Sequence, residues 1–226
     1  EQFEVTNLVA IVLPILGSFN LSLTNLGLYS LLTFSLVLGL HTLANNNFKL
    51  VPSKWSLLLE SLYASLLNLV RSQIGVNSEN YFPFIYSLFI FILISNLIAN
   101  IPYNYAISTS IITSLGYSVA IFIGTTVLSL SIHKVHFFSS FVPNGTPLGL
   151  VPALVWIETI SYLARGLSLG VRLFSNLVAG HTLLKILSGL LATLFTSGII
   201  VATITLVPFT IFVALVGLEI AVSFIQ

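Results

Sequence analysis

The chain has 226 residues, of which 57% are apolar and only 6% are charged, and its formal net charge is +1. Ordinary soluble domains carry roughly 25% charged residues, so this composition excludes a soluble protein and predicts a polytopic membrane protein. The near-neutral charge suggests no nucleic-acid partner, and the absence of cysteine excludes disulfides, thiolate metal sites and a thiol nucleophile.

The first half of the chain predicts three spans. Residues 1–20 are mixed in polarity and indicate a short lumenal or interfacial segment. Residues 21–44 supply the roughly 20 apolar residues that a bilayer core requires, and they predict the first span. Two further apolar stretches, 82–101 and 107–132, predict a second and a third span joined by a short loop.

Between the first two spans lies a stretch with a different pattern. Residues 53–73 place Trp55 and a series of leucines at helical spacing, opposite a stripe of serines with Glu60 and Arg71. This pattern is typical of an amphipathic helix that lies along a membrane surface. A helix packed beneath other subunits would show the same pattern, and both descriptions can hold together.

Basic residues set the expected orientation. Loops 45–81 and 133–150 lie on one side of the membrane if the three spans form, and they contain Lys49, Lys54, Arg71 and Lys134. The positive-inside rule places such loops in the cytoplasm or the mitochondrial matrix.

The C-terminal part does not fit simple spans. After a turn-rich loop at 133–152, residues 153–191 contain no proline, and a continuous helix there would run roughly 58 Å, about twice the hydrocarbon thickness. This stretch also carries five ionisable side chains. The sequence therefore predicts an all-α membrane protein that ends in a hairpin of two long, strongly tilted helices, 153–191 and 199–226. A turn is expected at 192–198, and Pro208 should kink the last helix or free a carbonyl.

The charges of the hairpin gather in two zones. At about 100° per residue, one face of the long helix is polar and has Arg172 near its middle; its members are Glu158, Ser161, Arg165, Ser168, Arg172, Ser175, Asn176 and Ala179. His181 falls on the opposite side. On the last helix Glu219, Ser223 and Gln226 share a second stripe.

Intramembrane ionisable residues are costly and are functional candidates by default. Glu158, His181 and Glu219 can exchange protons, whereas the guanidinium of Arg172 stays protonated. The structural alternative is that Arg165 and Arg172 merely form ion pairs with Glu158 and Glu219.

Gly166 and Gly170 indicate close packing between helices. The sequence shows no nucleophile with a paired base, no phosphate-binding glycine loop and no matched haem ligands, so no cofactor or metal is predicted.

Several stretches resemble one known family. "SLGVRLFSNLVAGH" (168–181), "FVPNGTPLGLVPALVWIETISYLARGLSLG" (141–170), "LEIAVSFIQ" (218–226) and "IANIPY" (98–103) are similar to motifs of subunit a of F-type ATP synthases. The mitochondrial, fungal branch is the most similar, and the resemblance covers nearly the whole chain. The family usually continues beyond the glutamine that is Gln226 here.

The resemblance implies a location in the mitochondrial inner membrane, with the basic loops on the matrix side. It implies a proton-translocating stator subunit, not catalytic alone, with a ring of c subunits, peripheral-stalk and other membrane subunits, and lipid as partners. Arg172 would face the ring, flanked by Asn176 and Gln226, while Arg165, Ser175 and Ser223 are secondary candidates. His181 and Glu219 would line an entry half-channel, and Glu158 the exit toward the matrix.

Two other classes remain open at this point. A secondary ion transporter or channel would show inverted repeats, which the sequence lacks. A purely structural membrane subunit of a respiratory complex would tolerate Arg172→Lys.

Overall fold

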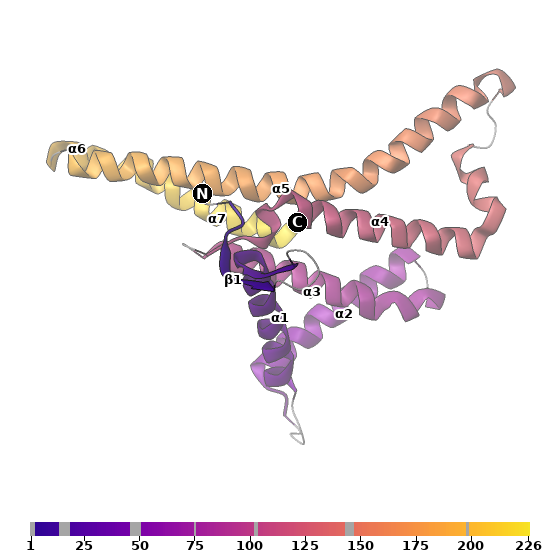
Figure 1. The fold of residues 1–226 in the computed structure, drawn as a ribbon, viewed down its shortest axis with the longest axis horizontal. Coiled ribbons are helices and arrows are strands. Elements are labelled where there is room, and N and C mark those ends of the chain that lie inside the picture. The colour runs from indigo at the N-terminus through magenta and orange to yellow at the C-terminus, as the bar shows by residue number, and fades with distance from the viewer. Residues whose placement is uncertain are drawn as a thin grey trace. The chain divides into compact units, whose positions relative to one another are not determined.

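The chain folds almost wholly into helices (Figure 1). The computed structural model describes residues 3–13, 19–45, 51–74, 76–101, 104–142, 147–197 and 199–226. Contacts divide the chain into two compact units. The first comprises Glu1–Ile107 with Ser223–Ile225, and the second comprises Ser108–Val222 with Gln226. The single membrane domain expected over 1–226 stays a prediction, and the two units are described in turn.

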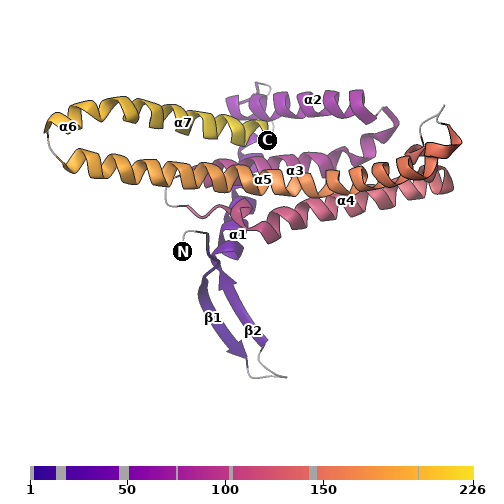
Figure 2. The same ribbon diagram turned by 90° about the horizontal axis from the view of Figure 1, so that it is seen from above.

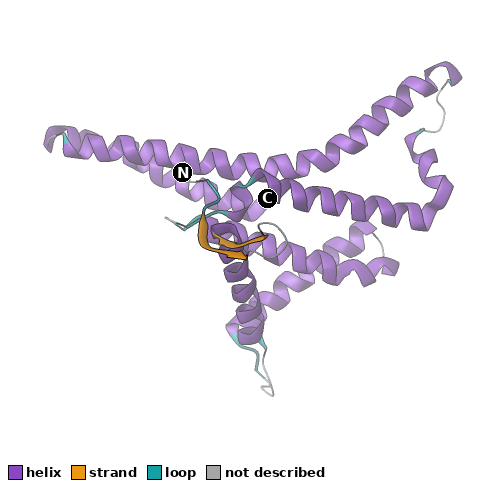
Figure 3. Cartoon of the chain, in the orientation of Figure 1, coloured by secondary structure: helices purple, strands orange, loops and turns teal. Residues whose placement is uncertain are grey.

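The first unit opens with a feature that the sequence analysis did not anticipate. Strands β1 (Asn7–Leu13) and β2 (Phe19–Thr24) pair antiparallel as a two-stranded sheet (Figure 2; orange in Figure 3). Helix α1 (Asn25–Ala44) therefore begins four residues after the start of the predicted span 21–44. Thr24 fixes this start as the N-cap, because its Oγ1 accepts a hydrogen bond from the backbone N–H of Gly27 at 3.3 Å.

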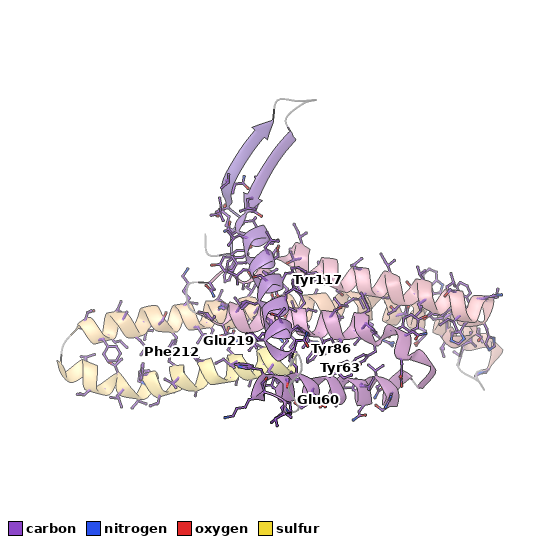
Figure 4. All side chains as sticks on the ribbon, turned by 90° about the horizontal axis from the view of Figure 1, so that it is seen from below. Glu60, Tyr63, Tyr86, Tyr117, Phe212 and Glu219 are labelled. Atoms are coloured by element: carbon purple, nitrogen blue, oxygen red, sulfur yellow. The ribbon has the colours of Figure 1, made fainter. Side chains whose placement is uncertain are left out.

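Three helical segments follow α1 in the first unit: α2 (Lys54–Ile74), the 3₁₀ helix η1 (Val76–Tyr81) and α3 (Phe82–Ala99). Aromatic side chains join them. The ring centroids of Tyr63 on α2 and Tyr86 on α3 lie 5.6 Å apart (Figure 4). His41 connects α1 to α3, since its Nε2 lies 3.2 Å from the Tyr86 hydroxyl. The ion pair of Arg71 with Glu79, at 2.7 Å, closes the turn between α2 and η1.

The second unit is built on α4 (Ile111–His133) and α5 (Val151–Thr196), and the short 3₁₀ helix η2 (Ile107–Thr109) precedes α4. The predicted loop 133–152 instead contains two 3₁₀ helices, η3 (Lys134–Phe141) and η4 (Leu148–Leu150). Aromatic packing holds η3 against α5. The rings of Phe137 and Phe141 both pack edge-on against Tyr162 of α5, with centroids 6.1 and 5.9 Å away.

Two glycines let α4 and α5 approach closely, as their spacing predicts. A Cβ on Gly170 would lie 2.8 Å from Ser118 Cβ and 2.9 Å from the Ser114 carbonyl oxygen. A Cβ on Gly166 would lie 2.7 Å from the ring of Phe122, and the Ser118 hydroxyl donates to the Gly166 carbonyl. The prediction of helix packing at Gly166 and Gly170 is therefore confirmed.

The C-terminal hairpin differs from its predicted boundaries. Helix α5 continues to Thr196, through most of the turn expected at 192–198. The returning segment is two helices, α6 (Ile199–Ile204) and α7 (Leu206–Ile225), where one helix was predicted over 199–226. The break at Thr205 follows from Pro208, whose ring would clash with the carbonyl four residues earlier, on Ile204. Figures 1 and 2 both show α5 and α7 side by side.

Five of the described helical segments are long and apolar enough to cross a membrane: 25–44, 79–99, 111–139, 151–196 and 206–225. The chain is thus an all-α polytopic membrane protein with a short N-terminal hairpin. The predicted number of about three spans excluded the two hairpin helices, and this accounts for the difference. Helix α2 is absent from the set, in keeping with its polar stripe.

Candidate functional site

The hairpin of α5 and α7 brings together His181 and Glu219, two ionisable side chains 38 positions apart in the sequence. His181 Nδ1 lies 3.8 Å from Glu219 Oε1, and the two side chains are only 15% and 9% exposed. This distance is too long for a direct hydrogen bond, but it suits charge attraction when the imidazole is protonated. Figure 4 marks Glu219 on α7.

Gly180 makes the space that the Glu219 carboxylate fills. A Cβ on Gly180 would lie 2.6 Å from Glu219 Oε1 and 3.0 Å from its Cδ. Real Cβ atoms essentially never approach this closely, so any other residue at position 180 would push the carboxylate aside. Nothing in the sequence alone distinguishes Gly180 from other helical glycines, although it directly precedes His181 in "SLGVRLFSNLVAGH".

The edge of the imidazole that carries Nε2 is also buried. Within the part of the chain that the structure describes, His181 Nε2 is buried and has no hydrogen-bond partner. A buried ring nitrogen without a partner is costly unless water or a protonic group reaches it. His181 can therefore accept or donate a proton at Nε2 while Nδ1 faces the carboxylate.

A second contact joins the two hairpin helices through amides. Asn176 Nδ2 donates a hydrogen bond to Gln226 Oε1 at 2.9 Å. The family resemblance implies that both residues flank Arg172, and in the fold they contact each other. Neither side chain is buried, so the amide pair lies at the surface of the second unit.

Arg172 is exposed on α5. Among the described residues it makes no ion pair or side-chain hydrogen bond, and the Ser175 hydroxyl donates to its backbone carbonyl at 3.3 Å. Arg165, also exposed, and the half-buried Glu158 likewise form no ion pair within the described ranges. The structural alternative, in which these arginines pair with Glu158 and Glu219, finds no support in the contacts.

Ser223 lies on α7, four residues after Glu219. It is buried and is grouped with the first unit, where its hydroxyl accepts a hydrogen bond from Asn100. Asn100 is a further polar residue that the sequence analysis did not identify. Helical spacing could not reveal it, because the contact joins residues 123 positions apart.

Among the described residues, no cluster of histidine and acidic side chains could hold a metal ion. The side chains that the hairpin does carry are His181 and Glu219, which can exchange protons, and Arg172, which keeps its positive charge.

Comparison with known proteins identifies the chain's relatives. A sequence model of the family described as "ATP synthase A chain" matches residues 27–226. The chain belongs to this family. Members named "ATP synthase subunit a" match all of the chain: it is 63% identical to that of Mycosarcoma maydis, and covers 89% of that protein. It is 46% identical to the subunit of Emericella nidulans and 45% identical to that of Kluyveromyces lactis, covering 88% and 89% of them.

The resemblance drawn from the sequence is thus confirmed, including its fungal character. Membership of the ATP synthase A chain family makes this chain a membrane subunit that works within a larger complex. It also argues against the secondary-transporter alternative.

Proposed function

We propose that this ATP synthase A chain conducts protons between the membrane surfaces and a rotating ring of c subunits, and so couples proton flow to rotation. The observation that carries the proposal is the enclosed pair of His181 and Glu219. Two proton-exchanging groups stand 3.8 Å apart on helices long and apolar enough to span a membrane. Such groups are expensive in a hydrocarbon layer unless they serve a path for ions.

Protons enter through the zone of His181 and Glu219. They neutralise a carboxylate on the ring, because the neutral acid can face lipid at far lower cost than the ionised form. After most of a turn, the ring site meets the exit zone at Glu158 and loses its proton toward the matrix. The membrane potential contributes about 2.3 kcal/mol per charge per 100 mV to this transfer.

Arg172 separates the two zones. Its guanidinium cannot relay a proton, and it lowers the pKa of a carboxylate brought beside it. It therefore favours the ionised form of the ring carboxylate at the point of passage and blocks a direct leak. The exposure of Arg172, with no ion-pair partner among the described residues, supports this role, since its charge is available to another subunit. Asn176 and Gln226 flank it, with Arg165, Ser175 and Ser223 as secondary participants.

The proposed setting is the mitochondrial inner membrane, with loops 45–81 and 133–150 on the matrix side and peripheral-stalk and other membrane subunits as neighbours. ATP chemistry takes place in other subunits.

Glu219→Gln in the assembled complex tests this function. The amide keeps the size of the side chain and cannot exchange protons, so proton-driven ATP synthesis is expected to fall about a hundredfold, as when a general acid–base group is removed. Glu60→Gln is the matched control, because Glu60 is an exposed acid on α2. Unchanged synthesis in Glu219→Gln, at normal assembly, would overturn the proposed path.

A further inference from the structure

An apolar groove separates α1 from α3 within the first unit. It runs between residues 34–41, in the second half of α1, and residues 84–91, in the first half of α3, and it has a volume of about 460 Å³. Of the ten described residues that line it, seven are phenylalanine, leucine, isoleucine or valine. Protein interiors leave few gaps of this size, because atoms that face a void lose their dispersion contacts. An apolar occupant would restore those contacts.

The three polar side chains among these lining residues are paired with the chain itself. His41 Nδ1 lies 2.8 Å from the Val37 carbonyl, which can only accept, so in the neutral imidazole Nδ1 carries the proton. His41 Nε2 then accepts from the Tyr86 hydroxyl at 3.2 Å (Figure 4). The Ser87 hydroxyl donates to the Phe84 carbonyl at 2.9 Å. The described lining of the groove therefore offers a ligand hydrocarbon contacts and no unpaired polar side chain.

The size of the groove fits one fatty acyl chain. Both helices are long and apolar enough to cross a membrane. Eight residues of helix rise about 12 Å, close to half of the roughly 30 Å hydrocarbon core, so the groove extends along about one leaflet. Its volume would hold about fifteen groups the size of a water molecule, each taking about 30 Å³, and a methylene group is similar in size.

A neighbouring transmembrane helix matches the groove less well. Helices in membranes meet through small residues, which let their backbones approach closely. Among the described residues that line the groove, Ser87 is the only small one. Large, branched and aromatic walls suit a flexible hydrocarbon chain better than the surface of a helix.

We infer that the groove between α1 and α3 binds one acyl chain of a membrane phospholipid as a resident lipid. The chain fills the space between the two helices and contacts both, whereas a boundary lipid touches the protein on one side. It therefore exchanges with the bilayer more slowly than boundary lipid does. The site does not depend on the proposed proton path, since His181 and Glu219 belong to the second unit.

A photoreactive phospholipid tests the site in the assembled complex. The complex is delipidated with detergent and reconstituted in vesicles that contain a phosphatidylcholine with a diazirine in one acyl chain. Unlabelled vesicles are then supplied in large excess, and light is applied after lipid exchange. Mass spectrometry of the subunit's peptides locates the label. The resident chain is expected to label residues 34–41 and 84–91 on the two sides of the groove, because boundary lipid is lost by exchange.

Leu31 on α1 and Leu97 on α3 are the comparison positions. Both are exposed, and neither is among the residues that line the groove. Equal label at these positions and in the groove would show that only boundary lipid is present. A groove without label would show that it is filled by something else, such as side chains of another subunit. Either result would overturn the inference.

Leu38→Trp is expected to displace the acyl chain. Leu38 lines the groove and is 51% exposed, so a larger side chain can occupy the groove without entering a packed core. Label at residues 84–91 is expected to be lost in this variant. Leu31→Trp is the matched control, because Leu31 lies one heptad earlier on nearly the same face of α1, and it is expected to keep the label.

Label retained in Leu38→Trp, or lost equally in both variants, would contradict a chain bound at this groove. If Leu38→Trp does not assemble, the label map of the unchanged complex decides alone. The labelling needs no turnover, so its outcome is separate from that of Glu219→Gln.

Discussion

The carboxylate of Glu219 stands where a side chain on Gly180 would have to be. The contact is made across two helices, and a Cβ at position 180 would lie 2.6 Å from Glu219 Oε1. Gly180→Ala is therefore expected to displace the carboxylate from His181 Nδ1 and to slow proton-driven ATP synthesis about tenfold or more, since small misplacements at a reacting group are costly. Synthesis rates in membrane vesicles, normalised to assembled complex, measure the effect.

Gly189→Ala provides the matched control for this variant. Gly189 lies on the same helix, and a Cβ there would meet nothing within 4 Å. Alanine in place of glycine stabilises a helix interior by roughly 0.5–1 kcal/mol, so both variants share this gain. Equal synthesis in Gly180→Ala and Gly189→Ala would show that Glu219 does not need its present position.

Arg172 is expected to be indispensable as a guanidinium. Arg172→Ala should abolish proton-driven ATP synthesis while the complex still assembles, because the charge that separates the two proton zones is lost. Arg172→Lys keeps a charge but loses the planar fork and adds a group that can deprotonate, so it should also fail. Synthesis and passive proton leak are measured together.

Arg165→Lys is the natural comparison, since Arg165 is also exposed and lies one heptad earlier. A purely structural subunit would tolerate Arg172→Lys as readily as Arg165→Lys. Normal coupled synthesis in Arg172→Lys would therefore show that proton translocation does not depend on the Arg172 guanidinium.

The contact between the Asn176 and Gln226 amides predicts that substitutions at these two positions have coupled effects on ATP synthesis. Because Asn176 Nδ2 donates to Gln226 Oε1 at 2.9 Å, Asn176→Ala and Gln226→Ala should have effects on synthesis that do not multiply. An interaction energy of about 1 kcal/mol is expected for an exposed pair of this kind. The measurement is a double-mutant cycle of synthesis rates. Strictly multiplicative effects would show that the amides act separately.

Helical periodicity in the sequence was enough to predict which site residues share a face of one helix. The wheel placed His181 opposite Arg172, and in the fold His181 faces α7 while Arg172 stays exposed. The stripe of Glu219, Ser223 and Gln226 was readable in the same way. The pairing of His181 with Glu219 was proposed only through the family resemblance, because no local rule states which turn of α5 meets which turn of α7.

Other features depend on contacts that a single helix cannot reveal. Gly180 looks like any helical glycine until Glu219 is placed beside it. Asn100 ends an apolar span, and its partner Ser223 lies near the far end of the chain. The break at Thr205 could have been located from Pro208, since a proline disrupts the helix four residues before itself. The strand β2 carries an alternating pattern, "FNLSLT", which the adjoining apolar run of α1 obscured.

The close approach of α4 and α5 predicts that alanine at Gly170 destabilises the subunit more than alanine at Gly166. A Cβ on Gly170 would lie 2.9 Å from the Ser114 carbonyl oxygen and 3.1 Å from Leu115 Cα, which are backbone atoms. The helices themselves would have to separate, and overpacking of this kind typically costs about 1–3 kcal/mol. Gly170→Ala should therefore lower the amount of folded subunit and its unfolding temperature.

Gly166→Ala should be milder, because a Cβ there would meet the side chain of Phe122, which can turn away. Gly116→Ala on α4 is the control, with nothing within 4 Å of its Cβ. Thermal unfolding of the purified complex and the level of subunit in membranes should rank Gly116→Ala as most stable, then Gly166→Ala, then Gly170→Ala. The reverse order would mean that α4 and α5 do not cross at Gly170, and the α5 helix that carries Arg172 and His181 would then be held in place by other contacts.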